Sequence, residues 1–249
     1  MLRLLCLLMI LAIPAKAEEI VLGLSQDEVA ITANFDGDDI LIFGAIKRDK
    51  PAPSDAQLGI IVTVAGPDVP VTVRRKDKRL GIWVNAEAVE IDVAPSFYAV
   101  ATNLPLAAIL DDKEDVNTRI SINRAVRAVG PSQGGGTDFE DALIRIRAGQ
   151  DLYQSLPDAV WIDDETLFRT EIALPANLTE GLYTAEIYLT RGGSIVDFYS
   201  TTIPVQKVGL ERWLYNLAHE NAFLYGLMSL AIAIAAGWSA SAVFSLFKR

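Results

Sequence analysis

The chain has 249 residues, of which 22 are basic and 32 acidic, so its formal net charge is −10 at pH 7. This acidic balance disfavours nucleic acid as a partner. The sequence holds one cysteine, Cys6, and one histidine, His219. That inventory excludes a disulfide within the chain, a Cys–His catalytic pair and a zinc or copper site of ordinary ligands.

The first 17 residues have the composition of a secretory signal peptide. Arg3 precedes an apolar run over residues 4–13, and Ala15 and Ala17 place small side chains where a signal peptidase cleaves. The apolar run is too short to span a bilayer. We expect residues 1–17 to be removed by cleavage; an uncleaved signal anchor is the alternative.

Residues 20–102 predict a succession of short strands. Runs of β-branched and aromatic residues alternate with turn signals at intervals of about ten residues, which is typical of an antiparallel sandwich. The expected strands are residues 29–32, 40–46, 58–64, 69–73, 80–84 and 97–101.

A run of cations separates the fourth of these strands from the fifth. It lies within residues 18–220, a segment that holds all 32 acidic residues and only 18 of the 22 basic ones. The run predicts a charged hairpin tip that contacts anionic headgroups or an acidic patch on a partner. The alternative is a solvated tip whose charges prevent edge-to-edge aggregation. The cations are Arg74, Arg75, Lys76, Lys78 and Arg79.

The pattern changes after residue 102. Apolar residues spaced by three and four predict helices within residues 104–157, which we interpret as an insert in the β domain. The strands expected after the insert are residues 159–162, 167–174, 182–190 and 194–205.

The crossing that precedes the third of these later strands resembles a tyrosine corner. Pro175 follows a strand, Gly181 permits a tight crossing and Tyr183 enters an alternating strand. In immunoglobulin-like sandwiches the hydroxyl of such a tyrosine binds upstream backbone. The predicted fold class is mainly β: an immunoglobulin-like antiparallel sandwich over residues 18–207 with a helical insert. Two small β domains are the alternative.

Three acidic clusters raise the question of a Ca²⁺ site or of paired-carboxylate chemistry. Their spacing matches no calcium loop, and turns or solvated helix ends explain them. We therefore predict no metal, no cofactor and no catalytic residue. The clusters are residues 36–39, 111–115 and 163–165.

The C-terminal segment predicts a membrane anchor. No charged side chain occurs between Glu220 and Lys248, and at about 1.5 Å per residue a helix over residues 222–247 crosses a hydrocarbon core of roughly 30 Å. An amphipathic juxtamembrane helix is expected over residues 208–221. The positive-inside bias places the basic tail, residues 248–249, in the cytoplasm, so the expected topology is single-pass type I.

Small residues recur at every fourth position along this predicted helix. Such a row lets another helix approach closely in lipid, either in a second copy or in another membrane protein. The alternative is a chance row in an alanine-rich helix. The residues are Ser229, Ala233, Gly237, Ser241 and Ser245.

Four segments of the chain resemble a family of alphaproteobacterial transmembrane proteins. They are Gly-Ile-Trp-Val-Asn at 81–85, Ser-Phe-Tyr-Ala-Val-Ala-Thr at 96–102, Ala-Leu-Pro-Ala-Asn-Leu at 173–178 and Val-Gly-Leu-Glu-Arg-Trp-Leu-Tyr at 208–215. The resemblance implies a bacterial inner membrane, an ectodomain in the periplasm and a transporter-linked role. It brings no catalytic residues.

These patterns predict a non-enzymatic, membrane-anchored periplasmic interaction protein, accessory to another membrane protein such as a transporter. The expected partners are the lipid bilayer and either another membrane protein or a second copy of the chain. The contrasting hypothesis is an envelope enzyme, or a protein that binds a small ligand, using carboxylates.

Overall fold

The computed structural model describes residues 18–26, 28–32, 35–48, 57–127, 136–208 and 210–247. The predicted signal peptide and cytoplasmic tail lie outside these ranges. The chain forms two compact units. The first runs to Val29 and resumes over Asp36–Val205, and the second comprises Ala30–Phe35 and Gln206–Arg249.

One sheet of the first unit has four strands in the order β1-β3-β10-β9, all antiparallel. Along β10 the even-numbered residues, such as Phe168 and Ile172, are buried and the odd-numbered ones are exposed. This alternation shows that one face of the sheet packs on a core. The strands are β1 (Glu18–Leu24), β3 (Gly37–Arg48), β10 (Leu167–Pro175) and β9 (Trp161–Asp163).

The other large sheet has six strands in the order β2-β12-β11-β4-β7-β8. Residues 58–64 of β4 and all of β7 are buried on both faces. The pairing of β7 with β8 is parallel, which the sequence pattern did not predict. The strands are β2 (Val29–Ile31), β12 (Ser194–Lys207), β11 (Gly181–Arg191), β4 (Leu58–Ala65), β7 (Tyr98–Thr102) and β8 (Tyr153–Leu156).

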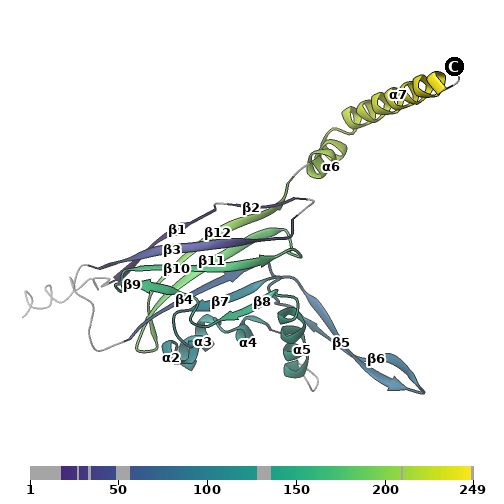
Figure 1. Cartoon of the computed structure of the whole chain (residues 1–249). Helices are drawn as coiled ribbons and strands as arrows, with labels where there is room; N and C mark the ends of the chain where they lie inside the picture. Colours follow the sequence, from purple (N-terminus) through teal and green to yellow (C-terminus); the bar gives the residue numbers. More distant parts are fainter. Residues whose placement is uncertain are drawn as a thin grey trace, which may run out of the picture. The chain divides into compact units, whose positions relative to one another are not determined.

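The first unit is a sandwich of these two sheets (Figure 1). Ile42 and Ile172 of one sheet and Tyr183 and Ile187 of the other are fully buried. The mainly β class is therefore confirmed. The order β1-β3-β10-β9 matches strands A-B-E-D of an immunoglobulin sandwich, and β12-β11-β4 matches G-F-C. The immunoglobulin-like assignment stays a prediction, which this order supports.

Short helices and one longer helix cover the outer face of the six-stranded sheet. They bury Tyr98, Val100 and Tyr188 together with Phe139 and Leu143 from α5. The Tyr98 hydroxyl donates a hydrogen bond to the carbonyl of Ile120, at 2.9 Å. The helices are α2 (Leu106–Ile109), α3 (Asp112–Thr118), α4 (Ile122–Ala125) and α5 (Gly136–Ala148).

A separate two-stranded ribbon, β5 (Val71–Arg79) and β6 (Ile82–Ile91), projects from the sandwich (Figure 1). Leu80 and Gly81 form its turn with φ values of 51° and 86°, as a two-residue type I′ turn requires. The prediction that residues 74–79 form the tip is therefore wrong, because the cations line strand β5. The error arose because Asp77-Lys78 has the composition of a turn, whereas a leucine at positive φ, such as Leu80, is rare.

The second unit contains α6 (Leu210–Glu220) and α7 (Ala222–Phe247). Residues Ala222–Ser241 of α7 are long and apolar enough to cross a membrane, and none of that stretch is buried within the structure. The apolar C-terminal helix expected from the sequence is confirmed.

Candidate interaction surfaces

Among the residues that the structure describes, the hairpin arm, residues 71–91, packs on the sandwich at its base. Val73 and Ile91 are buried in the core that includes α5, and the Arg75 guanidinium lies 5.7 Å from the centre of the Phe139 ring. Beyond this base the side chains of the arm are exposed or half-buried. The outer part of the arm therefore contributes little to the core of its own domain.

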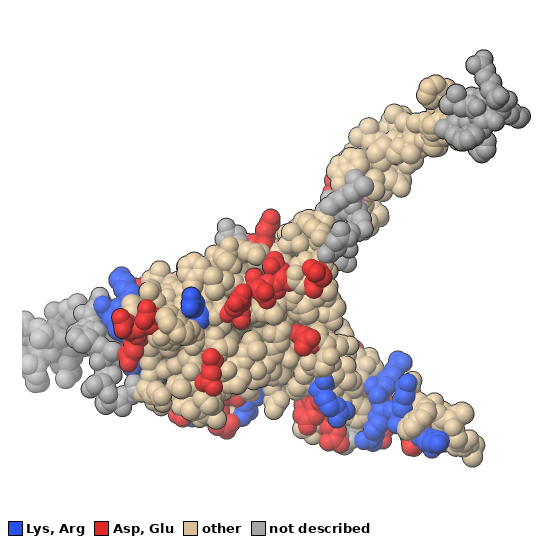
Figure 2. Space-filling model, viewed as in Figure 1, with Lys and Arg blue, Asp and Glu red and all other residues tan. Residues whose placement is uncertain are grey.

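The five predicted interaction cations lie along one strand of this arm. The Arg75 side chain pairs with Glu87, and Arg79 lies 3.7 Å from the Asp77 carboxylate. Within the described part of the chain, Arg74, Lys76 and Lys78 form no ion pair. Figure 2 shows Lys and Arg side chains gathered on the projecting arm, with uncharged residues at its end.

Apolar side chains occupy the end of the arm. Leu80 is fully exposed at the turn, and Ile82 and Trp83 have about two thirds of their surfaces exposed, at 65% and 67%. In the ladder Trp83 lies opposite Lys78, and Ile82 lies opposite Arg79. Sequence reasoning missed this tip because it assigned Leu80 to a half-buried strand.

A groove of about 290 Å³ runs between the base of the arm and α5. Its lining combines apolar side chains with Arg74, Arg75, Arg145 and Asp138. The apolar residues that line it are Val73, Phe139, Ala142 and Ile146.

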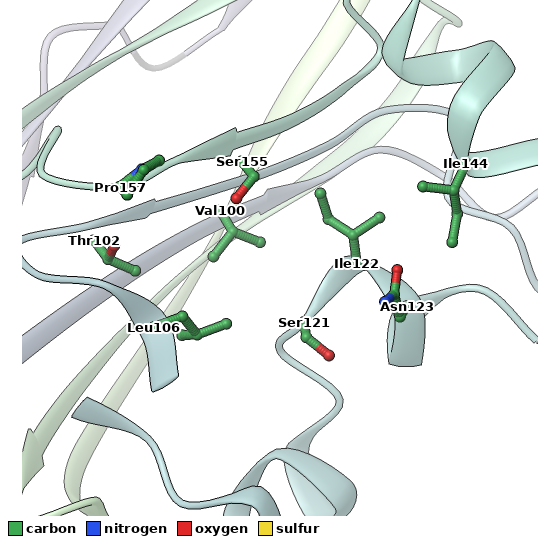
Figure 3. A pocket seen from close by; sticks show the side chains of 9 residues that line it. All are labelled: Val100, Thr102, Leu106, Ser121, Ile122, Asn123, Ile144, Ser155 and Pro157. Atoms are coloured by element: carbon green, nitrogen blue, oxygen red, sulfur yellow. The ribbon is translucent and has the colours of Figure 1, made fainter. Parts of the chain in front are cut away.

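A cavity of about 270 Å³ lies between β7, β8 and the inserted helices (Figure 3). Its lining offers hydroxyl and amide groups and apolar side chains but no ionisable group, so it has no acid or base of its own for catalysis. The residues that line it are Val100, Thr102, Leu106, Ser121, Ile122, Asn123, Ile144, Ser155 and Pro157.

The acidic clusters lie on different elements and hold local structure. Asp115 of α3 accepts hydrogen bonds from the Ser121 amide and from Nε of Arg124, both at 2.8 Å. Oδ1 of Asp38 accepts a hydrogen bond from the Asp39 amide at 2.9 Å. Over the residues that the structure describes, no group of three or more His, Cys, Asp or Glu side chains could hold a metal ion.

A buried carboxylate joins both sheets at the first described residue. Glu18 accepts a hydrogen bond from Nε of Arg48 at 2.6 Å, and from Nε and a terminal nitrogen of Arg191 at 3.0 and 2.8 Å. The bonds from Arg191 hold the pKa of Glu18 below its ordinary value. No sequence pattern predicts this cluster, because Arg191 lies 173 residues from Glu18 along the chain.

The predicted tyrosine corner lies where β10 crosses to β11. The fully buried Tyr183 donates its hydroxyl hydrogen to the Thr179 carbonyl at 2.9 Å, and burial raises the pKa of this hydroxyl. Gly181 has a φ of 155°, and a Cβ there would come within 2.8 Å of Pro67. Pro175 ends β10 opposite Gly37.

The row of small residues lies along α7. Ser229, Ala233, Gly237 and Ser241 are exposed, and their spacing of four places them on one side of the helix. A Cβ added at Gly237 would find no atom within 4 Å. The side chain of Ser245 lies outside the described set.

The family comparison covers almost the whole chain. The model of the family described as "Putative transmembrane protein (Alph_Pro_TM)" matches residues 19–246. The chain belongs to this family. Within the described part of this Alph_Pro_TM member, α7 is the one candidate membrane helix, and the match includes the arm and both sheets.

Other comparisons add little to the Alph_Pro_TM assignment. No curated protein matches the sequence. Among solved structures, the sporulation control protein Spo0M from Bacillus subtilis is similar, with 11% identity and a TM-score of 0.29. That similarity covers 84% of this chain and 56% of the Spo0M chain, so the chain spans about half the length of that protein.

Proposed function

We propose that this protein is a membrane-anchored interaction protein, accessory to another membrane protein of the bacterial inner membrane. In this proposal α7 crosses the membrane once and the β-sandwich lies in the periplasm. The family match and the apolar helix support the membrane attachment. Two observations favour binding over catalysis. The described residues contain no metal cluster, and the cavity in Figure 3 has no ionisable group in its lining.

The hairpin arm is the observation that carries the interaction role. Ordering its backbone costs conformational entropy, and an isolated two-stranded ribbon is at best marginally stable in water. The outer arm recovers little of that cost, because its side chains are exposed or half-buried. An element of this kind is useful when its contacts are made outside its own domain.

The accessory role is tested by purifying the full-length chain after extraction in mild detergent. The control replaces α7 by an unrelated spanning helix of the same length. A specific membrane protein that co-purifies with the parent but not with the helix-swapped chain supports the proposal. Recovery of the same proteins with both chains contradicts a contact through α7.

The proposed orientation has its own test. Protease added to spheroplasts should digest the sandwich without breaking the inner membrane, because the ectodomain lies on the outer side of that membrane. An ectodomain that is cut only after the cells are lysed would contradict the periplasmic location.

A further inference from the structure

The outer end of the arm combines exposed apolar side chains with cations. Leu80 lies in the turn, Ile82 and Trp83 lie level with Arg79 and Lys78 in the ladder, and Lys76 lies further back on β5. From Lys78 to Ala86 the sequence contains no acidic residue. Lys78 lies two positions behind Leu80, which is about 7 Å along a strand.

This spacing corresponds to the layers of a membrane surface. Apolar side chains of interfacial elements enter about 5–10 Å below the headgroups. Tryptophan favours the boundary between headgroups and hydrocarbon, and cations near the surface are attracted by anionic headgroups. With Leu80 below the headgroups, Ile82 and Trp83 lie near the hydrocarbon boundary at the level of Arg79 and Lys78, and the long side chains of these two cations extend to the phosphates.

We propose that the tip of the hairpin arm inserts into an anionic lipid surface, with Leu80, Ile82 and Trp83 entering the membrane and Lys76, Lys78 and Arg79 contacting the lipid phosphates. The inference rests on the proposed function in one respect, because it takes the chain to be membrane-anchored. An anchored chain keeps a bilayer at high effective concentration, so a weak contact of this kind is occupied.

The arrangement of the apolar residues favours lipid over a protein groove. Because side chains directly opposite in the ladder share a face, Trp83 lies beside Lys78 on one face of the ribbon and Ile82 lies beside Arg79 on the other. Leu80 extends from the turn between them. A protein groove covers one face of a ribbon, whereas fluid lipid surrounds a tip on every side.

The test uses the full-length chain with Cys6→Ser as the background, reconstituted into phosphatidylcholine vesicles with or without phosphatidylglycerol. A single cysteine replaces Leu80 and carries a fluorophore that reports the polarity of its surroundings. The control carries the same label at Ser194, an exposed position in the turn region between β11 and β12. A lipid-attached quencher is placed first in the vesicles that hold the protein and then in separate added vesicles.

The Leu80 label should shift to the blue and be quenched by lipid when phosphatidylglycerol is present, while the Ser194 label stays in water. Reversing three charges (Lys76→Glu, Lys78→Glu, Arg79→Glu) should lower the inserted fraction about tenfold or more. Ile82→Ser with Trp83→Ser should lower it as well. Both variants should keep the parent's melting temperature, since these side chains are exposed.

Three results would overturn the inference. The Leu80 label could stay in water in both kinds of vesicle, or it could enter both kinds equally. It could also become shielded as protein density rises, whatever the lipid, which would assign the tip to a second copy of the chain. None of these results alters the co-purification test of α7, so the two proposals fail separately.

Discussion

Glu18 shows how one side chain can connect three strands. It lies in β1 and binds Arg48 of β3 and Arg191 of β11, and its side chain is only 7% exposed. A charge taken out of water in this way is stable only while its partners remain. Removing the carboxylate takes away the charged acceptor that Arg48 and Arg191 share.

The first prediction concerns Glu18→Gln. The free energy of unfolding should fall by about 3 kcal/mol at neutral pH, measured by urea unfolding of the full chain in detergent. Glu19→Gln is the matched control, because Glu19 is 59% exposed and its ion pair with Lys47, at 3.5 Å, is also exposed; it should change stability by less than about 1 kcal/mol. Equal effects of the two changes would contradict the structural role of Glu18.

The lowered pKa of Glu18 predicts that the free energy of unfolding depends on pH. Its folded-state pKa is lowered, chiefly by Arg191, so its contribution is present above the unfolded-state pKa of about 4.3 and is lost as the pH falls through the folded-state value. The parent should therefore lose its advantage over Glu18→Gln below about pH 4. Unfolding midpoints measured from pH 7 to pH 3 would contradict this if the gap between the two chains stayed constant.

Tyr183→Phe tests the corner at the same scale. The change removes the hydrogen bond from the buried Tyr183 side chain to the Thr179 carbonyl, which should cost about 1 kcal/mol. The urea midpoint is the measurement. Tyr199→Phe, at a side chain 40% exposed, should leave it unchanged. A midpoint that Tyr183→Phe does not move would count against the corner.

At the scale of elements, the turn of the arm holds a residue, Leu80, whose backbone is strained and whose side chain is fully exposed. Leu80 adopts a φ of 51°, which costs a leucine roughly 1–2 kcal/mol. It is also the residue most exposed at the tip. Selection for stability alone favours Asn-Gly in such a turn, so an apolar residue held here suggests that the tip has a use outside the domain.

Leu80→Asn separates stability from this use. Asparagine tolerates positive φ better than leucine does, so the free energy of unfolding should stay the same or rise by up to about 1 kcal/mol. The melting temperature should therefore not fall. The fraction of arm tips inserted into anionic vesicles should fall, as reported by a fluorophore on a cysteine at Ile82. A variant that inserts as well as the parent would show that Leu80 is dispensable to the tip.

Gly81→Val, at a φ of 86°, should destabilise the turn.

Periodicity predicted most elements of the sandwich but not their partners. The alternation in β10 and the apolar run of β4 gave strands close to their observed bounds. The parallel pairing of β7 with β8 joins residues about 55 apart and leaves no local signal. Residues 74–79 were misplaced because strand β5 carries charge where a strand pattern requires apolar residues.

At the scale of the whole molecule, the sequence predicted the chemistry of the candidate surfaces better than their geometry. Composition alone predicted the cluster of cations in the arm and the apolar helix α7. The apolar tip, by contrast, depends on which two residues form a turn. The Glu18 cluster depends on strands brought together across the fold. Long-range contacts of this kind require the topology, which no window of the sequence contains.

The last prediction concerns how α7 uses the bilayer that it crosses. Lipid packs against bulky side chains at least as well as against small ones, so a row of small residues matters only when another helix approaches. Gly237→Ile places a branched side chain in the middle of that row and finds open space within its own chain.

Gly237→Ile should leave membrane insertion intact and remove the crosslinks or co-purified partners of the full-length chain. Ala235→Ile is the matched control, because two residues at 3.6 per turn place it about 200° around the helix from Gly237. It should retain every contact of the parent. Carbonate extraction checks that all three chains remain in the membrane. If Gly237→Ile also retains those contacts, the row is an accident of an alanine-rich helix, and protein partners must be sought on the sandwich.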